Sequence, residues 1–206
     1  LSTARLVSDR LTSSADPYVR KTAPILLDAI DKAVDLCSRT LEFTRDETPP
    51  LRRTRFGLRD LVEEVIAGLA PAAVGTRWLN DIDPALHAVA DRDQLYRAIA
   101  NLARNAMEAG AGRIAFKAAR TESRVAMIVA DDGPGIEAAN RERIFRRFFR
   151  AEHSRHQPGD GLGLALVRAI ADLHGAAISV SDNRPGAIFE VRLPRSGRAN
   201  ERVPLQ

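Results

Sequence analysis

Two consecutive prolines, Pro49 and Pro50, constrain the fold of this 206-residue chain more than any other feature. Proline lacks a backbone N–H group and disfavours a helical conformation of the residue before it, so no helix continues through the pair. The hydrophobic pattern is helical before the pair and changes to alternating helices and strands after it. We therefore predict a helical hairpin over residues 1–48, an α/β domain over residues 52–195 and a short tail over residues 196–206.

The hairpin is predicted from heptad spacing in its second helix. Two apolar stripes with alternating steps of three and four residues run side by side, which is typical of packed helices. They consist of Leu26, Ala29, Ala33, Leu36, Thr40 and Phe43, and of Leu27, Ile30, Val34, Cys37, Leu41 and Thr44. Together they form a face wider than one short preceding helix covers. A homodimeric four-helix bundle through residues 1–48 would bury both stripes. The alternative is a hairpin that packs on its own chain.

After the prolines, amphipathic spacing predicts one helix around residues 58–69 and a second from the capping residue Asp91 to about Ala109. A third helix is predicted to end at His174. Strands are predicted at Arg77–Ile82, His87–Ala90, Arg113–Ala119, Arg124–Ala130, Ala176–Ser181 and Ala187–Leu193. Since the strands come as adjacent pairs with helices between them, we predict an α+β fold. It is a two-layer sandwich, in which helices cover one face of a mixed sheet.

Composition limits the possible functions. A single cysteine, Cys37, excludes an internal disulfide and a thiolate metal cage. No apolar run is long enough to span a bilayer and no secretory leader is visible, so we expect a cytoplasmic fragment without membrane contact. The net charge of +4 reflects a chain whose basic residues are almost all arginine. We interpret this as a solvated surface and expect no nucleic-acid partner.

Asn101 and Asn105 are candidate binding residues because they lie four residues apart on the predicted helix and so share one face. Carboxamides can hold a metal ion or a phosphate group without adding negative charge beside a polyanion. Taken alone, two polar residues on a helix equally indicate an exposed face.

A first glycine-rich motif, Asp131–Ile136, directly follows an apolar strand. It places the carboxylate of Asp131 beside a turn in which Gly133 and Gly135 leave the backbone free of side chains. A carboxylate can accept a hydrogen bond from the exocyclic amine of adenine, and it disfavours the oxygen that guanine has at that position. The alternative is an ordinary Asp-Gly turn.

A second glycine-rich motif, Gly159–Leu164, opens the third predicted helix. Glycines at a helix start let backbone N–H groups approach phosphates. The motif is neither a dinucleotide-binding fingerprint nor a P-loop, because Lys-Ser/Thr is absent and no strand immediately precedes it. Between the two motifs, Arg141–Arg150 mixes phenylalanine and arginine. We interpret it as a lid whose phenylalanines dock on the domain and whose arginines meet phosphates, rather than as a nucleic-acid site.

Together and in this order, these motifs resemble those of the sensor histidine kinases, and the resemblance covers nearly the whole chain. The matching segments are Asn101–Ala106 (N box), Asp131–Ile136 (first glycine box), Arg143–Arg150 (F box), Gly159–Leu164 (second glycine box), Leu41–Arg45 (end of the second dimerisation helix), and His174-Gly175, Gly186–Phe189 and Leu193-Pro194 (closing strands). Each box is weakly specific, whereas four boxes at fitting spacing are specific.

The resemblance implies a domain that binds ATP and Mg²⁺. The γ-phosphate is transferred to a histidine on the dimerising hairpin, and then to an aspartate in the receiver domain of a response regulator. It also implies that Asn105 holds Mg²⁺, that Asn101 lies beside the phosphates as the second catalytic residue, and that Asp131 contacts the adenine amine. The other implied nucleotide contacts are Gly133, Gly135, Ile136, Gly159, Gly161, Leu162, Gly163, Leu164 and one or both of Arg150 and Arg155.

Two departures from the family pattern bear on activity. The first histidine of the chain is His87, and Leu1–Leu6 is similar to the segment that comes after the family's acceptor box. We therefore expect the acceptor to lie upstream, in a longer protein that can carry a membrane anchor, and we expect this chain not to autophosphorylate. The second departure is Asn101, which stands where related chaperone and mismatch-repair ATPases place a glutamate base. Asparagine cannot take a proton from water, which disfavours hydrolysis. The alternatives are a degenerate phosphotransfer or scaffold module and an ATP-gated clamp.

Overall fold

The computed structural model describes residues 50–73, 75–150 and 161–194. All of them belong to one compact unit, Pro49–Gln206. The predicted hairpin over residues 1–48 and the predicted tail over residues 196–206 lie outside the described residues. Among the helices within those ranges, none has the length and apolar character needed to cross a membrane.

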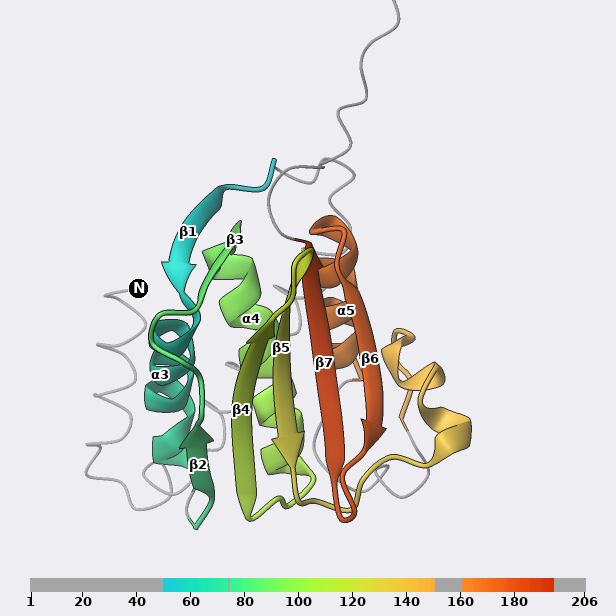
Figure 1. Ribbon diagram of the computed structural model, residues 1–206. Coiled ribbons are helices and arrows are strands. Elements are labelled where there is room, and N and C mark those ends of the chain that lie inside the picture. The colour runs from blue at the N-terminus through green and yellow to red at the C-terminus, as the bar shows by residue number, and fades with distance from the viewer. Residues whose placement is uncertain (1–49, 74, 151–160, 195–206) are drawn as a thin grey trace, which may run out of the picture. The chain divides into compact units, whose positions relative to one another are not determined.

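The main layer is a five-stranded sheet in the order β2-β4-β5-β7-β6 (Figure 1). Its strands are β2 (Arg77–Asn80), β4 (Arg113–Arg120), β5 (Arg124–Asp131), β6 (Ala177–Asp182) and β7 (Ala187–Pro194). β2 runs parallel to β4, and the other neighbours are antiparallel. The predicted mixed sheet is thus confirmed.

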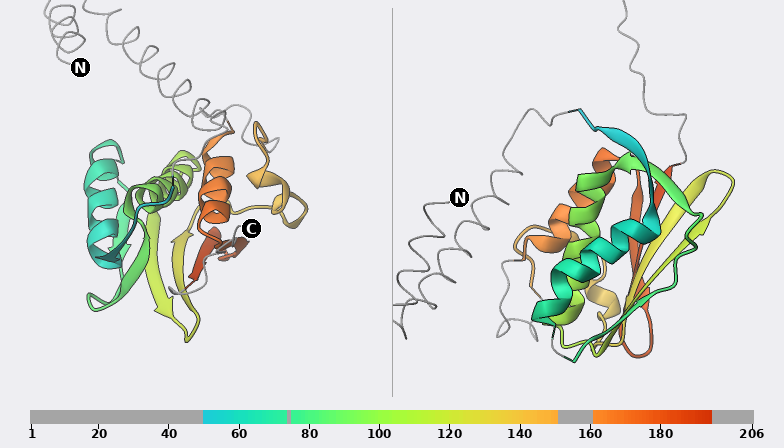
Figure 2. Two further views of the ribbon diagram at one scale, coloured as in Figure 1. Left: turned by 90° about the horizontal axis from the view of Figure 1, so that it is seen from above. Right: turned by 90° about the vertical axis from the view of Figure 1, so that its left-hand side faces the viewer.

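Three helices, α3 (Leu58–Leu69), α4 (Arg92–Glu108) and α5 (Gly163–Leu173), lie on one face of this sheet (Figure 2). A short 3-10 helix, η1 (Ala70–Ala72), follows α3. The core between the layers is built from the apolar faces of the helices and of the sheet. Its largest fully buried side chains include Leu61 on α3, Leu95 and Ile99 on α4, and Phe116 on β4. These are positions at which the amphipathic spacing placed an apolar side chain.

Two further strands form a separate two-stranded antiparallel sheet, β1 (Arg53–Gly57) with β3 (His87–Asp91). β1 was not predicted, because its first three residues are polar and exposed and show no alternation of burial. Of the strands that are adjacent in sequence, β4 pairs with β5 and β6 pairs with β7. β2 and β3 do not pair with each other, because β2 pairs with β4 and β3 pairs with β1.

α4 begins at its predicted cap, since the Asp91 side chain accepts a hydrogen bond from the Gln94 backbone N–H at 3.2 Å. The Asp91 backbone N–H donates to Nε2 of His174 at 3.0 Å, and Nδ1 of that ring lies 2.8 Å from the Ile170 carbonyl oxygen. Because Nε2 accepts and a carbonyl can only accept, Nδ1 carries the ring proton. His174 is buried, so it joins the start of α4 to the end of α5 and fixes the two helices that carry the candidate site.

Candidate functional site

The predicted site residues that the structure describes surround the second half of α4. Asp131 is the last residue of β5, and the next motif residue, Gly133, packs against Ala109 at the end of α4. Gly163 is the first residue of α5, and it packs against the carboxamides on α4. The turn after β5 and the start of α5 are therefore both neighbours of one helix, although about 30 residues of chain separate them.

Asp131 is a buried carboxylate held by two backbone donors. Its Oδ1 accepts hydrogen bonds from Gly133 N at 2.9 Å and from Ala187 N at 3.2 Å. Burial raises the pKa of this carboxyl above its ordinary value, and the nearby Asp132 carboxylate adds to the increase, while the two hydrogen bonds oppose it. Both hydrogen bonds end on Oδ1, so Oδ2 is the oxygen left to accept from a ligand.

Glycines surround Asp131 because the backbones approach too closely for side chains. Gly186 has φ +107°, and a Cβ there would lie 1.8 Å from the Asp131 carbonyl oxygen. Gly135 has φ +77°, and a Cβ there would lie 2.9 Å from the Gly186 carbonyl oxygen. L side chains rarely adopt such φ values, so both positions require glycine. The turn of the first motif thus packs backbone to backbone against the loop between β6 and β7.

The carboxamides of Asn101 and Asn105 face the first residue of α5. A Cβ added at Gly163 would lie 3.2 Å from Asn101 Oδ1 and 3.6 Å from Asn105 Oδ1. The Asn101 side chain is 8% exposed and is oriented by its Nδ2, which donates to the Arg97 carbonyl oxygen at 2.8 Å. Asn105 Nδ2 is buried and has no hydrogen-bond partner among the described residues. A buried amide donor without a partner is costly, so this Nδ2 is available to an acceptor group of a ligand.

The segment between the two glycine motifs contains η2 (Ala138–Asn140) and η3 (Arg143–Phe145). Ile144 is buried, and Phe145 packs edge to face against Phe189 of β7 at 6.4 Å between ring centroids. This agrees with the predicted docking of the lid. Phe148 differs, because its side chain is 68% exposed. The guanidinium of Arg143 lies 4.8 Å from the centroid of the Phe149 ring.

The second glycine motif meets the F box through its backbone. Gly161 has φ +70°, and a Cβ there would lie 2.9 Å from the Phe148 carbonyl carbon. Its carbonyl oxygen accepts a hydrogen bond from Phe148 N at 3.0 Å. Of the remaining predicted contacts, Leu162 is buried, and Ile136, Arg150 and Leu164 are half-buried. Arg155 and Gly159 lie outside the described residues.

Sequence reasoning missed one residue of this region, Asn183. Its Nδ2 donates to the Asp131 carbonyl oxygen at 2.6 Å, so it secures the end of β5 from the loop between β6 and β7. The sequence does contain a turn signal here, an Asn followed by Arg-Pro-Gly186. That signal predicts the turn but not which strand end the side chain reaches.

The arrangement combines three properties that suit a charged and flat ligand. A buried carboxylate oxygen can accept from a ligand amine, a glycine-led helix start can donate backbone N–H groups to anions, and two carboxamides stand beside that helix start. The carboxamide oxygens can also hold a hard metal ion such as Mg²⁺.

Known proteins are similar to this chain in sequence and in fold. Residues 90–197 match the family model described as histidine kinase-, DNA gyrase B-, and HSP90-like ATPase. The signal transduction histidine-protein kinase/phosphatase MprB of Mycobacterium sp. (strain KMS) is 32% identical over 178 residues, which cover 80% of this chain and 33% of MprB. The signal transduction histidine-protein kinase AfsQ2 of Streptomyces coelicolor is 30% identical over 189 residues, 88% of this chain and 34% of AfsQ2.

Among solved structures, full-length ShkA in complex with AMPPNP is similar to this chain with a TM-score of 0.80 at 26% identity. The similarity covers 94% of this chain and 42% of the ShkA chain. The chain spans about one third of the length of the curated relatives that it matches.

Proposed function

The chain belongs to the family of histidine kinase-, DNA gyrase B- and HSP90-like ATPases, and on that premise we propose that it is the ATP-binding catalytic part of a sensor histidine kinase. The relatives named above are histidine-protein kinases, which favours a kinase over a scaffold module or an ATP-gated clamp. ATP is the ligand that an ATPase family implies, and the ShkA relative was solved with AMPPNP, an ATP analogue.

The observation that carries the proposal is the contact between Gly163 and the two carboxamides of α4. A Cβ at residue 163 would lie 3.2 Å from Asn101 Oδ1 and 3.6 Å from Asn105 Oδ1, so any side chain there would crowd both carboxamides. The first N–H groups of α5 have no partner within that helix and point out of its start. Phosphate oxygens placed here would accept from these N–H groups and from the buried Nδ2 of Asn105.

Asn105 is the residue we assign to Mg²⁺. Rotation of its carboxamide by half a turn exchanges Oδ1 and Nδ2, so the group can offer either an oxygen ligand or a donor. Mg²⁺ prefers a few protein oxygens together with substrate phosphate oxygens, and one neutral carboxamide fits that preference. Bound there, Mg²⁺ would neutralise charge on the transferring phosphoryl group. Asn101, held by Arg97, is assigned to the phosphates beside it.

Asp131 is the residue we assign to the base. Its Oδ2 would accept from the exocyclic amine of adenine while Oδ1 stays on Gly133 N and Ala187 N. Guanine carries an oxygen at that position, which the carboxylate repels, so this site should favour ATP over GTP. Gly133, Gly135 and Ile136 would form the adjacent wall. Arg150 on the lid, with Gly161, Leu162 and Leu164, would complete the enclosure of the phosphates.

The proposed acceptor is a histidine on a dimerising hairpin, followed by an aspartate in a response regulator. An imidazole nitrogen is nucleophilic without a base, so catalysis requires orientation and charge neutralisation rather than proton removal. Asn101 suits this chemistry because it cannot activate a water molecule. We further propose that residues 1–48 form the homodimer contact, as their two heptad stripes indicate.

The test is calorimetric titration of the 206-residue chain with ATP and with GTP, with and without Mg²⁺. We expect ATP to bind more tightly than GTP, and Asn105→Ala to weaken Mg²⁺-dependent ATP binding by about tenfold or more, since one charge-assisted contact is worth about 1.5–3 kcal/mol. Gln94→Ala is the matched control, a carboxamide on the same helix and about 16 Å from Asn105 along its axis. Equal ATP affinity in the two variants would contradict the assigned metal position.

The transfer step needs a separate measurement. Incubated with labelled ATP and Mg²⁺, the chain alone should stay unlabelled, because its first histidine, His87, lies in the ATP-binding domain. A histidine-bearing hairpin from a kinase relative, added in trans, should take up a label that is acid-labile and alkali-stable. An acid-stable label on serine or threonine would exclude the histidine-kinase assignment.

A further inference from the structure

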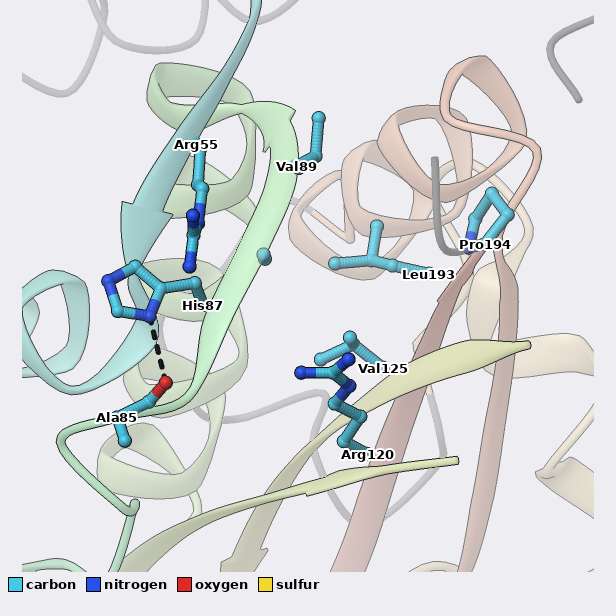
Figure 3. A pocket seen from close by; sticks show the side chains of 9 residues that line it. Arg55, Ala85, His87, Val89, Arg120, Val125, Leu193 and Pro194 are labelled. Atoms are coloured by element: carbon cyan, nitrogen blue, oxygen red, sulfur yellow. Dashed lines mark hydrogen bonds between the residues drawn. The ribbon is translucent and has the colours of Figure 1, made fainter. Parts of the chain in front are cut away.

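A cavity of about 350 Å³ lies at the other end of the sheet from the candidate site. It is bounded by Val125 at the start of β5, Leu193 near the end of β7 and Arg120 at the end of β4, with β1 and β3 on the opposite side (Figure 3). Val125 precedes Asp131 by six residues on one strand, so the cavity is about 20 Å from the candidate site. None of the residues assigned above to ATP binding lines it.

The polar lining of this cavity is cationic. Arg55 from β1 and Arg120 from β4 approach it from opposite sides, and His87 from β3 lies beside Arg55 (Figure 3). No carboxylate lines it, and neither guanidinium has an ion-pair partner among the described residues. Some other arginines of this domain do form ion pairs, for example Arg59 with Glu63. Two unpaired cations around one hollow attract an anion.

The floor of the cavity is apolar. Val125 is 5% and Leu193 is 3% exposed, so they form a fixed wall that continues the core. Val89 on β3 is 37% exposed, which makes it one of only a few large apolar side chains that reach solvent in the part of the chain described. A ligand for this cavity therefore gains by placing an apolar group between Val89 and Leu193.

Unpaired strand edges flank the same cavity. β2 ends at Asn80 opposite Phe116, so Lys117–Arg120 of β4 has β5 on one side and no described strand on the other. Among the strands that the structure describes, β3 pairs only with β1. Exposed edges of this kind offer backbone N–H and C=O groups to an added extended segment.

From the charges, the apolar floor and the free edges together, we propose that this cavity docks an extended acidic peptide segment of a partner protein. Carboxylates of that segment contact Arg55 and Arg120, and an apolar side chain between them packs on Val89, Val125 and Leu193. A nucleic acid fits less well, since two arginines make a short phosphate track and no Phe, Tyr or Trp lines the cavity for a base to stack on. The proposal does not depend on the nucleotide site.

The probe is a fluorescein-labelled synthetic peptide of alternating glutamate and leucine, titrated with the 206-residue chain by fluorescence polarisation at low ionic strength. The comparison peptide has glutamine in place of glutamate. The test variant is Arg55→Gln with Arg120→Gln. The control variant, Arg53→Gln with Arg124→Gln, removes the same charge from exposed positions on β1 and β5 that do not line the cavity.

We expect the acidic peptide to bind and the neutral one to bind much more weakly. The test variant should lose about tenfold in affinity, since each surface charge contact is worth up to about 1 kcal/mol, and the control variant less than about twofold. Val89→Ala should lose about threefold through the apolar contact. ATP affinity and the thermal midpoint should be the same in all variants, which shows that they fold.

Three results would overturn the proposal. One is no binding of the acidic peptide, and another is equal losses in the test and control variants, which would indicate non-specific charge attraction. The third is a DNA oligonucleotide that competes with the peptide and loses affinity in the test variant more than the peptide does. That outcome would assign the cavity to a nucleic acid instead.

Discussion

The substitution Asp131→Asn separates ligand recognition from folding at the candidate site. Asparagine has the shape of aspartate, and the structure dictates how it must lie. Its Oδ1 has to remain against Gly133 N and Ala187 N, because the opposite orientation would set the amide donor against two backbone donors. The amide nitrogen therefore takes the place of Oδ2, where it would face the amine of adenine.

This reversal exchanges an acceptor for a donor at one contact. A hydrogen bond from a neutral donor to a buried carboxylate contributes about 1.5–3 kcal/mol, and leaving the ligand amine unpaired adds to the loss. We expect ATP affinity to fall by about 2–3 kcal/mol, or about 30- to 150-fold. GTP should lose less than ATP, because the new amide can donate to the guanine oxygen. The preference for ATP over GTP should shrink accordingly.

The pKa of Asp131 determines the direction of two further effects, on the stability of the free chain and on the pH dependence of ATP affinity. Burial raises this pKa in the folded chain, so the proton stabilises the fold below the ordinary value of 3.8, and that stabilisation is lost as pH rises through the raised value. At neutral pH the ionised carboxylate lowers stability, and asparagine avoids that cost. We expect Asp131→Asn without nucleotide to melt at the same or a higher temperature. ATP affinity of the parent chain should weaken on acidification from neutral pH more than that of the variant, which has no carboxyl group at this position to protonate.

The assay is calorimetric titration with both nucleotides over a pH series, with thermal melts of the free chain. Asp132→Asn is the control, since the Asp132 side chain accepts from Arg113 N at 2.8 Å and is not assigned to the ligand. An unchanged ATP affinity in Asp131→Asn, or an equal loss in Asp132→Asn, would refute the assignment of Asp131 to the base. A lower melting temperature of the free variant would refute the reasoning about its pKa.

Three other substitutions or truncations test the same geometry. Gly163→Ala should lower ATP affinity by about tenfold, because the new Cβ would lie 3.2 Å from Asn101 Oδ1. The urea midpoint should stay nearly constant, because the higher helix propensity of alanine, worth about 1 kcal/mol, offsets the cost of this crowding. An unchanged affinity would place the phosphates elsewhere. Gly186→Ala should lower the free energy of unfolding by about 3 kcal/mol or more, because its Cβ would lie 1.8 Å from the Asp131 carbonyl oxygen; a smaller loss in urea titration would contradict this packing. A chain of residues 52–206 should sediment as a monomer and the 206-residue chain as a dimer, and an equal oligomeric state would exclude residues 1–48 as the contact.

Features that depend on neighbouring residues were predictable from the sequence. The amphipathic run around residues 58–69 gave a helix whose observed bounds are Leu58–Leu69, and Asp91 caps α4 as its position suggested. The turn at the first glycine motif and the helix start at the second were predictable for the same reason. A turn or a helix start depends on residues within a few positions of it, so the local sequence indicates it.

Features that depend on distant segments were not predictable in the same way. β1 became visible only through its pairing with β3, whose residues are at least 30 positions away, because its own residues are mostly polar. The contact of Asn183 with the Asp131 carbonyl spans 52 residues. The bond between His174 and the Asp91 backbone spans 83 residues. Polar contacts over such separations leave no periodicity, so a single sequence cannot indicate them.

The two helices that flank the candidate site differ at their first turns, because α4 has a side-chain cap and α5 has none. α4 starts with a side-chain cap from Asp91, whereas α5 starts after Leu162, whose side chain has no polar atom to offer. The open helix start lies beside the carboxamide of Asn105, whose Nδ2 is buried without a partner among the described residues. Asp131 Oδ2, which the two backbone donors leave free, is a third group available to a ligand. A ligand with phosphate oxygens and an exocyclic amine satisfies all three groups at once. Binding should therefore stabilise this fold, by about 2.7 kcal/mol when the ligand concentration is 100 times Kd.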